Sequence, residues 1–222
     1  MQLQSAIFDM DGTLIDSMPM WMEVGLNVLH AHGIHPEPEL ANYLSTLTLE
    51  QAADYCREQY LPDLTADALL QEIYDQAETF FRNEVQAKPG VCAFLSLLQS
   101  KGVKMCVATN TDRYLVDIAL RHAGIDSYFG EILTCSEVGQ GKKAGSKIYE
   151  QALLRLGANK QDTVVFEDAL HAIRTAKNAG FRVCAIYDPA AEAEQEEIRN
   201  LSDYYVRSFG ELISKRNEEI ST

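Results

Sequence analysis

From about residue 84 onward, the chain alternates short runs of apolar and β-branched residues with stretches of helical periodicity. Several of the helical stretches are followed by a glycine, where a left-handed C-cap is expected. Strand–helix alternation of this kind predicts an α/β fold, with a parallel sheet covered by helices on both faces. The predicted strands in this part of the chain cover residues 103–108, 132–135, 163–166 and 182–186.

Residues 17–83 have a different pattern, with almost no β-like run and several amphipathic helical stretches. Segments 16–19 and 88–90, at its two borders, contain the Pro and Gly residues of turns or hinges. We therefore predict an all-helical domain over residues 17–83, inserted into an α/β core made of residues 1–16 and 84–222. The predicted helices cover residues 21–32, 49–59 and 66–81.

The apolar run over residues 3–8 is followed directly by two carboxylates, Asp9 and Asp11, and by Gly12. Residues i and i+2 of an extended strand point to the same side, so the two carboxylates emerge together where this first strand ends. Gly12 allows the backbone to turn sharply there. Carboxylates at the carboxyl end of a parallel strand are typical of a hard-cation site, although Asp-x-Asp-Gly alone is also common in ordinary acidic turns.

Three later segments carry polar groups at or near predicted strand ends. In a parallel sheet these ends face one edge, so the groups are expected to converge with the two carboxylates after the first strand. Taken alone, the Thr and Asp residues could be helix caps and the Lys a solvated surface residue; the joint pattern favours a site. The groups are Thr109 with Asn110, Lys142, and Glu167 with Asp168.

The formal net charge is −14 over 222 residues, which argues against binding to a nucleic acid polymer or an anionic membrane. No stretch reaches the roughly 18 apolar residues that a membrane helix needs. The N-terminal residues lack the pattern of a signal peptide, and the five widely spaced cysteines are typical of reduced thiols. A cytoplasmic protein is therefore expected.

The order and content of these motifs resemble those of the haloacid dehalogenase superfamily, in the branch with a helical cap inserted after the first strand. The likeness covers essentially the whole chain. It implies a Rossmann-like sheet and a cap that closes over the site. It also implies a Mg²⁺-dependent phosphatase, which hydrolyses a small phosphorylated metabolite through an aspartyl-phosphate intermediate.

The resemblance also implies a role for each candidate residue. Asp9 matches the nucleophile that attacks phosphorus, and Asp11 matches the general acid/base. Thr109, Asn110 and Lys142 match the groups that bind the phosphoryl oxygens of the substrate. The implied metal ligands are Asp9, Asp11, Asp168 and Glu167.

Elementary electrostatics agrees with those roles. Four ionised carboxylates at one edge would repel a phosphomonoester, which itself carries about −1.5 to −2 at pH 7. One Mg²⁺ held by oxygen ligands, together with Lys142, is the minimum compensation. Like-charged neighbours also raise the pKa of a carboxyl group, which suits the proton transfers expected of Asp11.

The third motif departs most from the family pattern. Relatives usually have Gly-Lys-Pro-x-Pro-Asp, whereas residues 141–147 read Gly-Lys-Lys-Ala-Gly-Ser-Lys. Counting forward from Gly139 selects Lys142 as the motif lysine, and counting back from Tyr149 selects Lys143. We take Lys142, because a glycine precedes it, and keep Lys143 as the alternative.

A phosphatase is favoured over three alternatives. Dehalogenases of the superfamily need neither the second Asp nor a metal. Sugar phosphomutases of the β-phosphoglucomutase type are the nearest alternative; they have Gly-Val after the second Asp and an early cap histidine, where this chain has Thr13 and Trp21. Receiver-like phosphoacceptor modules are about half this length and lack the insertion. Residues 18, 20, 21 and 44–48 are candidates for choosing the substrate, and their apolar character equally fits packing inside the helical domain.

Overall fold

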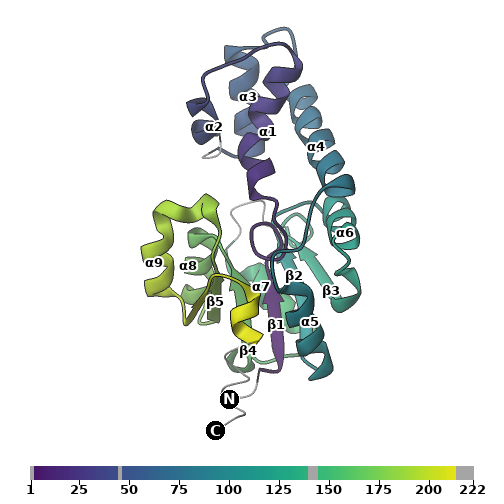
Figure 1. Ribbon diagram of the computed structural model, residues 1–222, viewed down its shortest axis with the longest axis vertical. Coiled ribbons are helices and arrows are strands. Elements are labelled where there is room, and N and C mark those ends of the chain that lie inside the picture. The colour runs from purple at the N-terminus through teal and green to yellow at the C-terminus, as the bar shows by residue number, and fades with distance from the viewer. Residues whose placement is uncertain (1–2, 45–46, 140–144, 214–222) are drawn as a thin grey trace. The chain divides into compact units, whose positions relative to one another are not determined.

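The computed structural model describes residues 3–44, 47–139 and 145–213, and the chain divides into two compact units (Figure 1). The core unit comprises Met1–Asp16 and Gln86–Thr222, and the helical unit comprises Ser17–Val85. No helix in the described ranges combines the length and the apolar character needed to cross a lipid bilayer.

The core unit contains a six-stranded sheet in the order β3-β2-β1-β4-β5-β6, in which every pairing is parallel. Phe8, the last residue of β1, pairs with Val107 of β2 on one side and Phe166 of β4 on the other. The strand order reverses between β1 and β4, which is where α/β folds of this type bind ligands. The strands are β1 Ser5–Phe8, β2 Lys104–Thr109, β3 Glu131–Thr134, β4 Thr163–Glu167, β5 Arg182–Ile186 and β6 Tyr204–Val206.

Helices cover both faces of this sheet, as the sequence predicts. Two consecutive residues of β1, Ile7 and Phe8, contact helices on opposite faces of the sheet. Ile7 belongs to the apolar cluster that includes Ile148 of α7 and Ile173 of α8. Phe8, on the opposite face, stacks on Phe166, which in turn contacts Phe94 of α5. The core helices are α5 Val91–Ser100, α6 Arg113–His122, α7 Lys147–Leu156, α8 Leu170–Asn178 and α9 Gln195–Leu201, with short 3-10 helices η1 Asp126–Tyr128, η3 Lys160–Asp162 and η4 Pro189–Glu194.

The helical unit has an apolar core of its own. Leu69, Ile73, Ala77 and Phe81 recur every four residues along α4 and are all buried. They lie along the apolar face that the periodicity of this segment predicts, and Leu69 and Ile73 belong to a cluster that continues through α1 and α3. The helices are α1 Met18–Ala31, α2 Glu39–Leu44, α3 Leu49–Gln59 and α4 Ala66–Asn83.

The predicted elements differ from the observed ones mainly at their ends. Helix α1 begins at Met18 rather than residue 21, because Pro19 suits the first helical turn. Helix α2 and the edge strand β6 were missed, because they are six and three residues long and too short for a periodic signal. The predicted α/β class, with a parallel sheet and an inserted helical segment, is confirmed.

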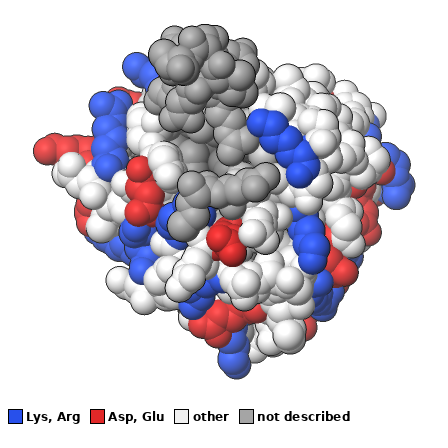
Figure 2. Space-filling view, turned by 90° about the horizontal axis from the view of Figure 1, so that it is seen from below, with Lys and Arg blue, Asp and Glu red and all other residues white. Residues whose placement is uncertain are grey.

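Charged side chains of both signs are interspersed over the described part of the face in Figure 2. Such a surface differs from the basic stripe by which proteins bind nucleic acid polymers. The formal net charge of −14 is likewise unlike the positive charge of such proteins.

Candidate active site

Three carboxylates meet at the carboxyl ends of β1 and β4. Asp9 follows β1 directly, whereas Glu167 ends β4 and Asp168 comes next. Each offers one oxygen, and these oxygens all lie within 4.8 Å of one another. The Asp9 amide donates a hydrogen bond of 3.0 Å to the carbonyl of Phe166, which holds the start of the turn after β1 against β4. All three ligands are hard oxygen donors, the type that Mg²⁺ prefers.

The environment raises the pKa of each of these carboxyl groups. Burial is the main reason that the pKa of Asp9 lies well above its usual value, and the charges of Glu167 and Asp168 add to it. Burial and the neighbouring Asp168 likewise raise the pKa of Glu167. Burial raises the pKa of Asp168 to about 7, although a hydrogen bond from Thr13 lowers it. A cluster of this kind is stable in its ionised form only with a compensating cation, so the residues fit a bound metal.

A tight turn after β1 brings a hydroxyl group to this cluster. Gly12 has a positive φ of 76°, and its amide donates to the carbonyl of Ile15 at 3.1 Å. A side chain at position 12 would be strained in this conformation. Within the turn, the buried Thr13 hydroxyl donates to Asp168 Oδ1 at 2.7 Å. The turn therefore contributes a group that orients Asp168, besides its own two carboxylates.

Two threonine hydroxyl groups lie at the end of β2 and just after it. The Thr111 hydroxyl donates to Asp11 Oδ2 at 2.7 Å. The Thr109 hydroxyl is buried and accepts a hydrogen bond of 3.3 Å from the Thr111 amide. Thr109 does not cap α6, whose N-cap residue is Asp112. Asn110, between the two threonines, is exposed.

The structure thus places six of the residues singled out in the sequence at the carboxyl ends of three adjacent strands, β2, β1 and β4. These residues are Asp9, Asp11, Thr109, Asn110, Glu167 and Asp168. Lys142 and its alternative Lys143 lie outside the described residues.

An ion pair between Lys88, which is partly buried, and the buried Asp188 was not foreseen. Their nitrogen and oxygen atoms are 2.7 Å apart, and the side chains are 11% and 1% exposed. The charge of Asp188 raises the pKa of Asp168, and the charge of Lys88 lowers it, so both belong to the electrostatic surroundings of the cluster. In the sequence, Lys88 stands out only as a border residue. No local pattern pairs residues that are 100 positions apart.

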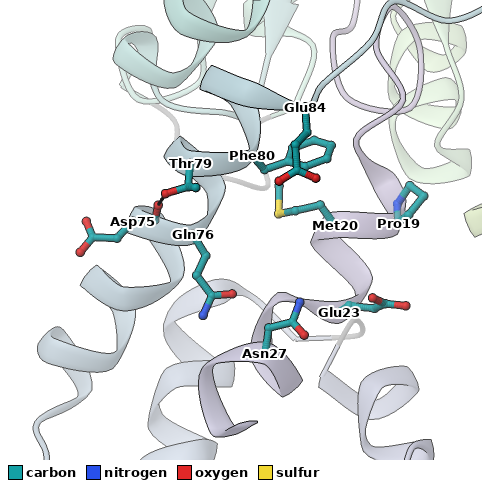
Figure 3. Close-up of a pocket in the computed structure, with 9 residues that line it drawn as sticks. All are labelled: Pro19, Met20, Glu23, Asn27, Asp75, Gln76, Thr79, Phe80 and Glu84. Atoms are coloured by element: carbon teal, nitrogen blue, oxygen red, sulfur yellow. Dashed lines mark hydrogen bonds between the residues drawn. The ribbon is translucent and has the colours of Figure 1, made fainter. Parts of the chain in front are cut away.

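The helical unit holds a groove of about 550 Å³ between α1 and α4. Figure 3 shows Met20 and Phe80 toward one end of it and the amide side chains of Asn27 and Gln76 toward the other. Of the positions expected to choose the substrate, Met20 therefore lines the groove. Trp21 instead packs edge-on against Phe81, at a ring distance of 6.0 Å. Residues 45 and 46 lie outside the described ranges.

The sequence pattern of the family described as haloacid dehalogenase-like hydrolase matches residues 6–186. The chain is 26% identical to the phosphorylated carbohydrates phosphatase of Thermotoga maritima, over 80% of this chain and 82% of that protein. It is also 26% identical to hexitol phosphatase A of Escherichia coli, over 89% of each. The crystal structure of CbbY from Rhodobacter sphaeroides in complex with phosphate superposes on this chain with a TM-score of 0.79. The superposition covers 95% of this chain and 96% of CbbY, and the two are 22% identical, so the likeness shows the fold alone.

Proposed function

Because the chain belongs to the haloacid dehalogenase-like hydrolase family, we propose that it is a Mg²⁺-dependent phosphatase that hydrolyses small phosphorylated metabolites through an aspartyl-phosphate on Asp9. The observation that carries the proposal is the meeting of Asp9, Glu167 and Asp168 at the point where the strand order reverses. The cluster offers oxygen ligands only, with Glu167 and Asp168 buried and Asp9 partly exposed, which suits the binding of Mg²⁺ and of a phosphoryl group.

The carboxylates of Asp9, Glu167 and Asp168 would hold the metal, with Asp11 beside them. When bound, Mg²⁺ supplies positive charge that offsets the carboxylates and the phosphoryl oxygens of the substrate. Thr13 keeps Asp168 in place through its hydrogen bond of 2.7 Å, which leaves that carboxylate less freedom to rotate away.

Asp9 and Asp11 divide the reaction into two displacements. A carboxylate oxygen of Asp9 attacks phosphorus, the bond from phosphorus to the leaving oxygen breaks, and that oxygen takes a proton from the Asp11 carboxyl group. Water then attacks the phosphorus of the aspartyl-phosphate, the bond from phosphorus to the Asp9 oxygen breaks, and the water gives a proton to the Asp11 carboxylate. Inorganic phosphate leaves, and both side chains return to their initial states.

The remaining residues would bind and orient. The Thr111 hydroxyl holds Asp11 at 2.7 Å, so that its carboxyl group stays aimed at the leaving oxygen. Thr109 and the backbone at Asn110 are assigned to the phosphoryl oxygens, since they end the strand beside β1. Lys142 is assigned to the same phosphoryl group, with Lys143 as the alternative, to add the positive charge that an anionic substrate requires.

We further assign the substrate to phosphorylated carbohydrates and polyols. The two phosphatases described above, one for phosphorylated carbohydrates and one for hexitol phosphates, support this choice. Within the helical unit, the groove offers Asn27, Gln76 and Thr79, whose amide and hydroxyl groups are suited to sugar hydroxyls. These side chains are candidates for distinguishing one sugar from another.

The experiment that tests the proposal measures phosphate release from sugar phosphates, hexitol phosphates, nucleotides and p-nitrophenyl phosphate, with Mg²⁺ or with a chelator. Release is expected only with Mg²⁺. The Asp9→Asn enzyme, which keeps the side-chain volume, should lose at least about 10³-fold in kcat, because the nucleophile is gone. Release that survives Asp9→Asn would refute the mechanism. Interconversion of sugar phosphates without release would replace the phosphatase with a phosphomutase.

A further inference from the structure

Lys88 joins three segments of the core unit through its ammonium group. Its Nζ donates to the carbonyl oxygen of Gly12 at 2.5 Å, to the carbonyl oxygen of Tyr187 at 2.9 Å and to Asp188 Oδ2 at 2.7 Å. An ammonium group has three N–H donors, so these bonds use all of them. The first acceptor belongs to the turn that carries Asp9, Asp11 and Thr13, and the other two follow β5.

The backbone of Lys88 is fixed as firmly as its side chain. Its amide donates to the carbonyl of Leu14 at 2.9 Å, and the Asp16 amide donates to the carbonyl of Gln86 at 2.9 Å. The segment in which the chain leaves the core unit therefore runs alongside the segment in which it returns. Lys88 lies in the returning segment and reaches back to the turn after β1.

The ion pair between Lys88 and Asp188 differs from an ordinary ion pair at the surface. Lys88 is 11% exposed and Asp188 is 1% exposed, and Asp188 also accepts a hydrogen bond of 2.9 Å from the Ala190 amide. Burying such a pair costs desolvation energy that its attraction does not reliably exceed. The ion pair alone is therefore a weak argument for a contribution to stability. The hydrogen bond from Lys88 to the Gly12 carbonyl, however, reaches the turn that holds the proposed nucleophile.

We propose that Lys88 is a positioning residue for the phosphatase reaction: its ammonium group, held by Asp188, fixes the Gly12 carbonyl and thereby the turn that carries Asp9, Asp11 and Thr13. This inference rests on the function proposed above. Lys88 touches neither substrate nor reacting atoms in this account, and it acts through the geometry of the turn.

The test compares three variants with the wild type. Lys88→Met removes the ammonium group and keeps most of the side-chain volume. Lys88→Met with Asp188→Asn removes both charges, so that no carboxylate is left buried without a cation. Lys160→Met is the matched control. Lys160, like Lys88, is partly buried and donates to a carbonyl, that of Ala179 at 2.7 Å, but it lies just before the amino end of β4.

The first readout is hydrogen exchange of the backbone amides in residues 9–16, where Gly12, Leu14 and Ile15 donate within the turn. Both Lys88 variants should exchange about tenfold faster there, and Lys160→Met should not. Unchanged exchange in the Lys88 variants would overturn the proposal, whatever the activity of the protein. Absence of phosphatase activity in the wild type would instead refute the proposed function.

The second readout is the split between kcat and KM at saturating Mg²⁺. Both Lys88 variants should lose about 10- to 100-fold in kcat with little change in KM, because the reacting groups lie slightly off their productive geometry. A purely structural role predicts that the double variant recovers the wild-type kcat as its thermal stability recovers. That recovery would also overturn the proposal.

Discussion

The two units of this protein differ in the side chains that they bury. Among the described residues, the buried charged side chains all lie in the core unit: Glu167, Asp168 and Asp188. In the described part of the helical unit, Ser17 is the only buried residue that is polar. Burying carboxylates costs stability, whereas burying apolar side chains provides it. The core unit therefore gives up stability to bury the groups of its candidate active site, whereas the described part of the helical unit buries almost only apolar side chains.

The largest expected effect is on turnover, from one carboxylate of the core unit. Asp11→Asn keeps the size of the side chain and an acceptor for the Thr111 hydroxyl, but it cannot donate and accept the proton. The value of kcat should fall by about 10²- to 10⁴-fold, the usual contribution of a general acid/base. Steady-state kinetics with p-nitrophenyl phosphate measures it.

The control is the same substitution in the helical unit. Asp67 is an exposed residue in the first turn of α4, and Asp67→Asn should leave kcat within about twofold of the wild type. Equal losses in the two variants would contradict the division between a chemical core unit and a packed helical unit.

The next effect is on stability, through the metal. On the function proposed above, Mg²⁺ binds the folded carboxylate cluster and not the unfolded chain, so it should stabilise the protein by about 2.7 kcal/mol at a concentration 100 times its Kd. Thermal unfolding followed with Mg²⁺ and with chelator measures the shift. Asp168→Asn should abolish most of it, and Asp67→Asn should preserve it. A full shift in Asp168→Asn would remove Asp168 from the metal site.

Local patterns predict the parts of this molecule that local forces decide. A strand such as β4, buried along its whole length, reads as an apolar run, and the residues after β1 and β4 follow from the direction of the strands. Contacts between distant segments leave no such pattern. Nothing in the sequence pairs Lys88 with Asp188 or aims Thr111 at Asp11, because each of these pairs is 100 positions apart. The candidate cluster was therefore predictable, and the groups that orient it were not.

A smaller effect belongs to the helical unit alone. The Thr48 hydroxyl accepts from the Gln51 amide at 3.2 Å, and the Gln51 side chain accepts from the Thr48 amide at 3.0 Å, which is a capping box at the start of α3. Thr48→Ala should lower the free energy of unfolding by about 1 kcal/mol. Denaturant titration measures the loss, and Thr48→Ser, which keeps the hydroxyl, should show little of it. A change in kcat beyond about twofold would argue that this helix affects the chemistry.

The smallest effect concerns an ion pair at the surface of the core unit. The hydrogen bonds from Arg113, the main cause, lower the pKa of Glu137, which also accepts from the Thr134 amide at 3.2 Å. A carboxyl group whose pKa is lower in the folded state adds stability at pH values above the pKa of the unfolded state, which is about 4.3. This stability disappears as the pH falls through the pKa of the folded state. Because both side chains are more than a third exposed, water limits the contribution to less than about 1 kcal/mol.

Glu137→Gln should therefore lower the free energy of unfolding slightly at pH 7, and its difference from the wild type should shrink toward pH 3. Urea titrations at several pH values measure this; a difference that stays constant with pH would mean that charge plays no part. The Arg82–Glu78 pair on α4 is the counterpart in the helical unit, and Glu78→Gln should cost a similarly small amount at pH 7. If Glu137→Gln and Glu78→Gln lower the free energy of unfolding equally, the surface ion pairs of the two units do not differ. The contrast between the units then lies in the buried carboxylates, whose free energy depends on burial rather than on the number of charges.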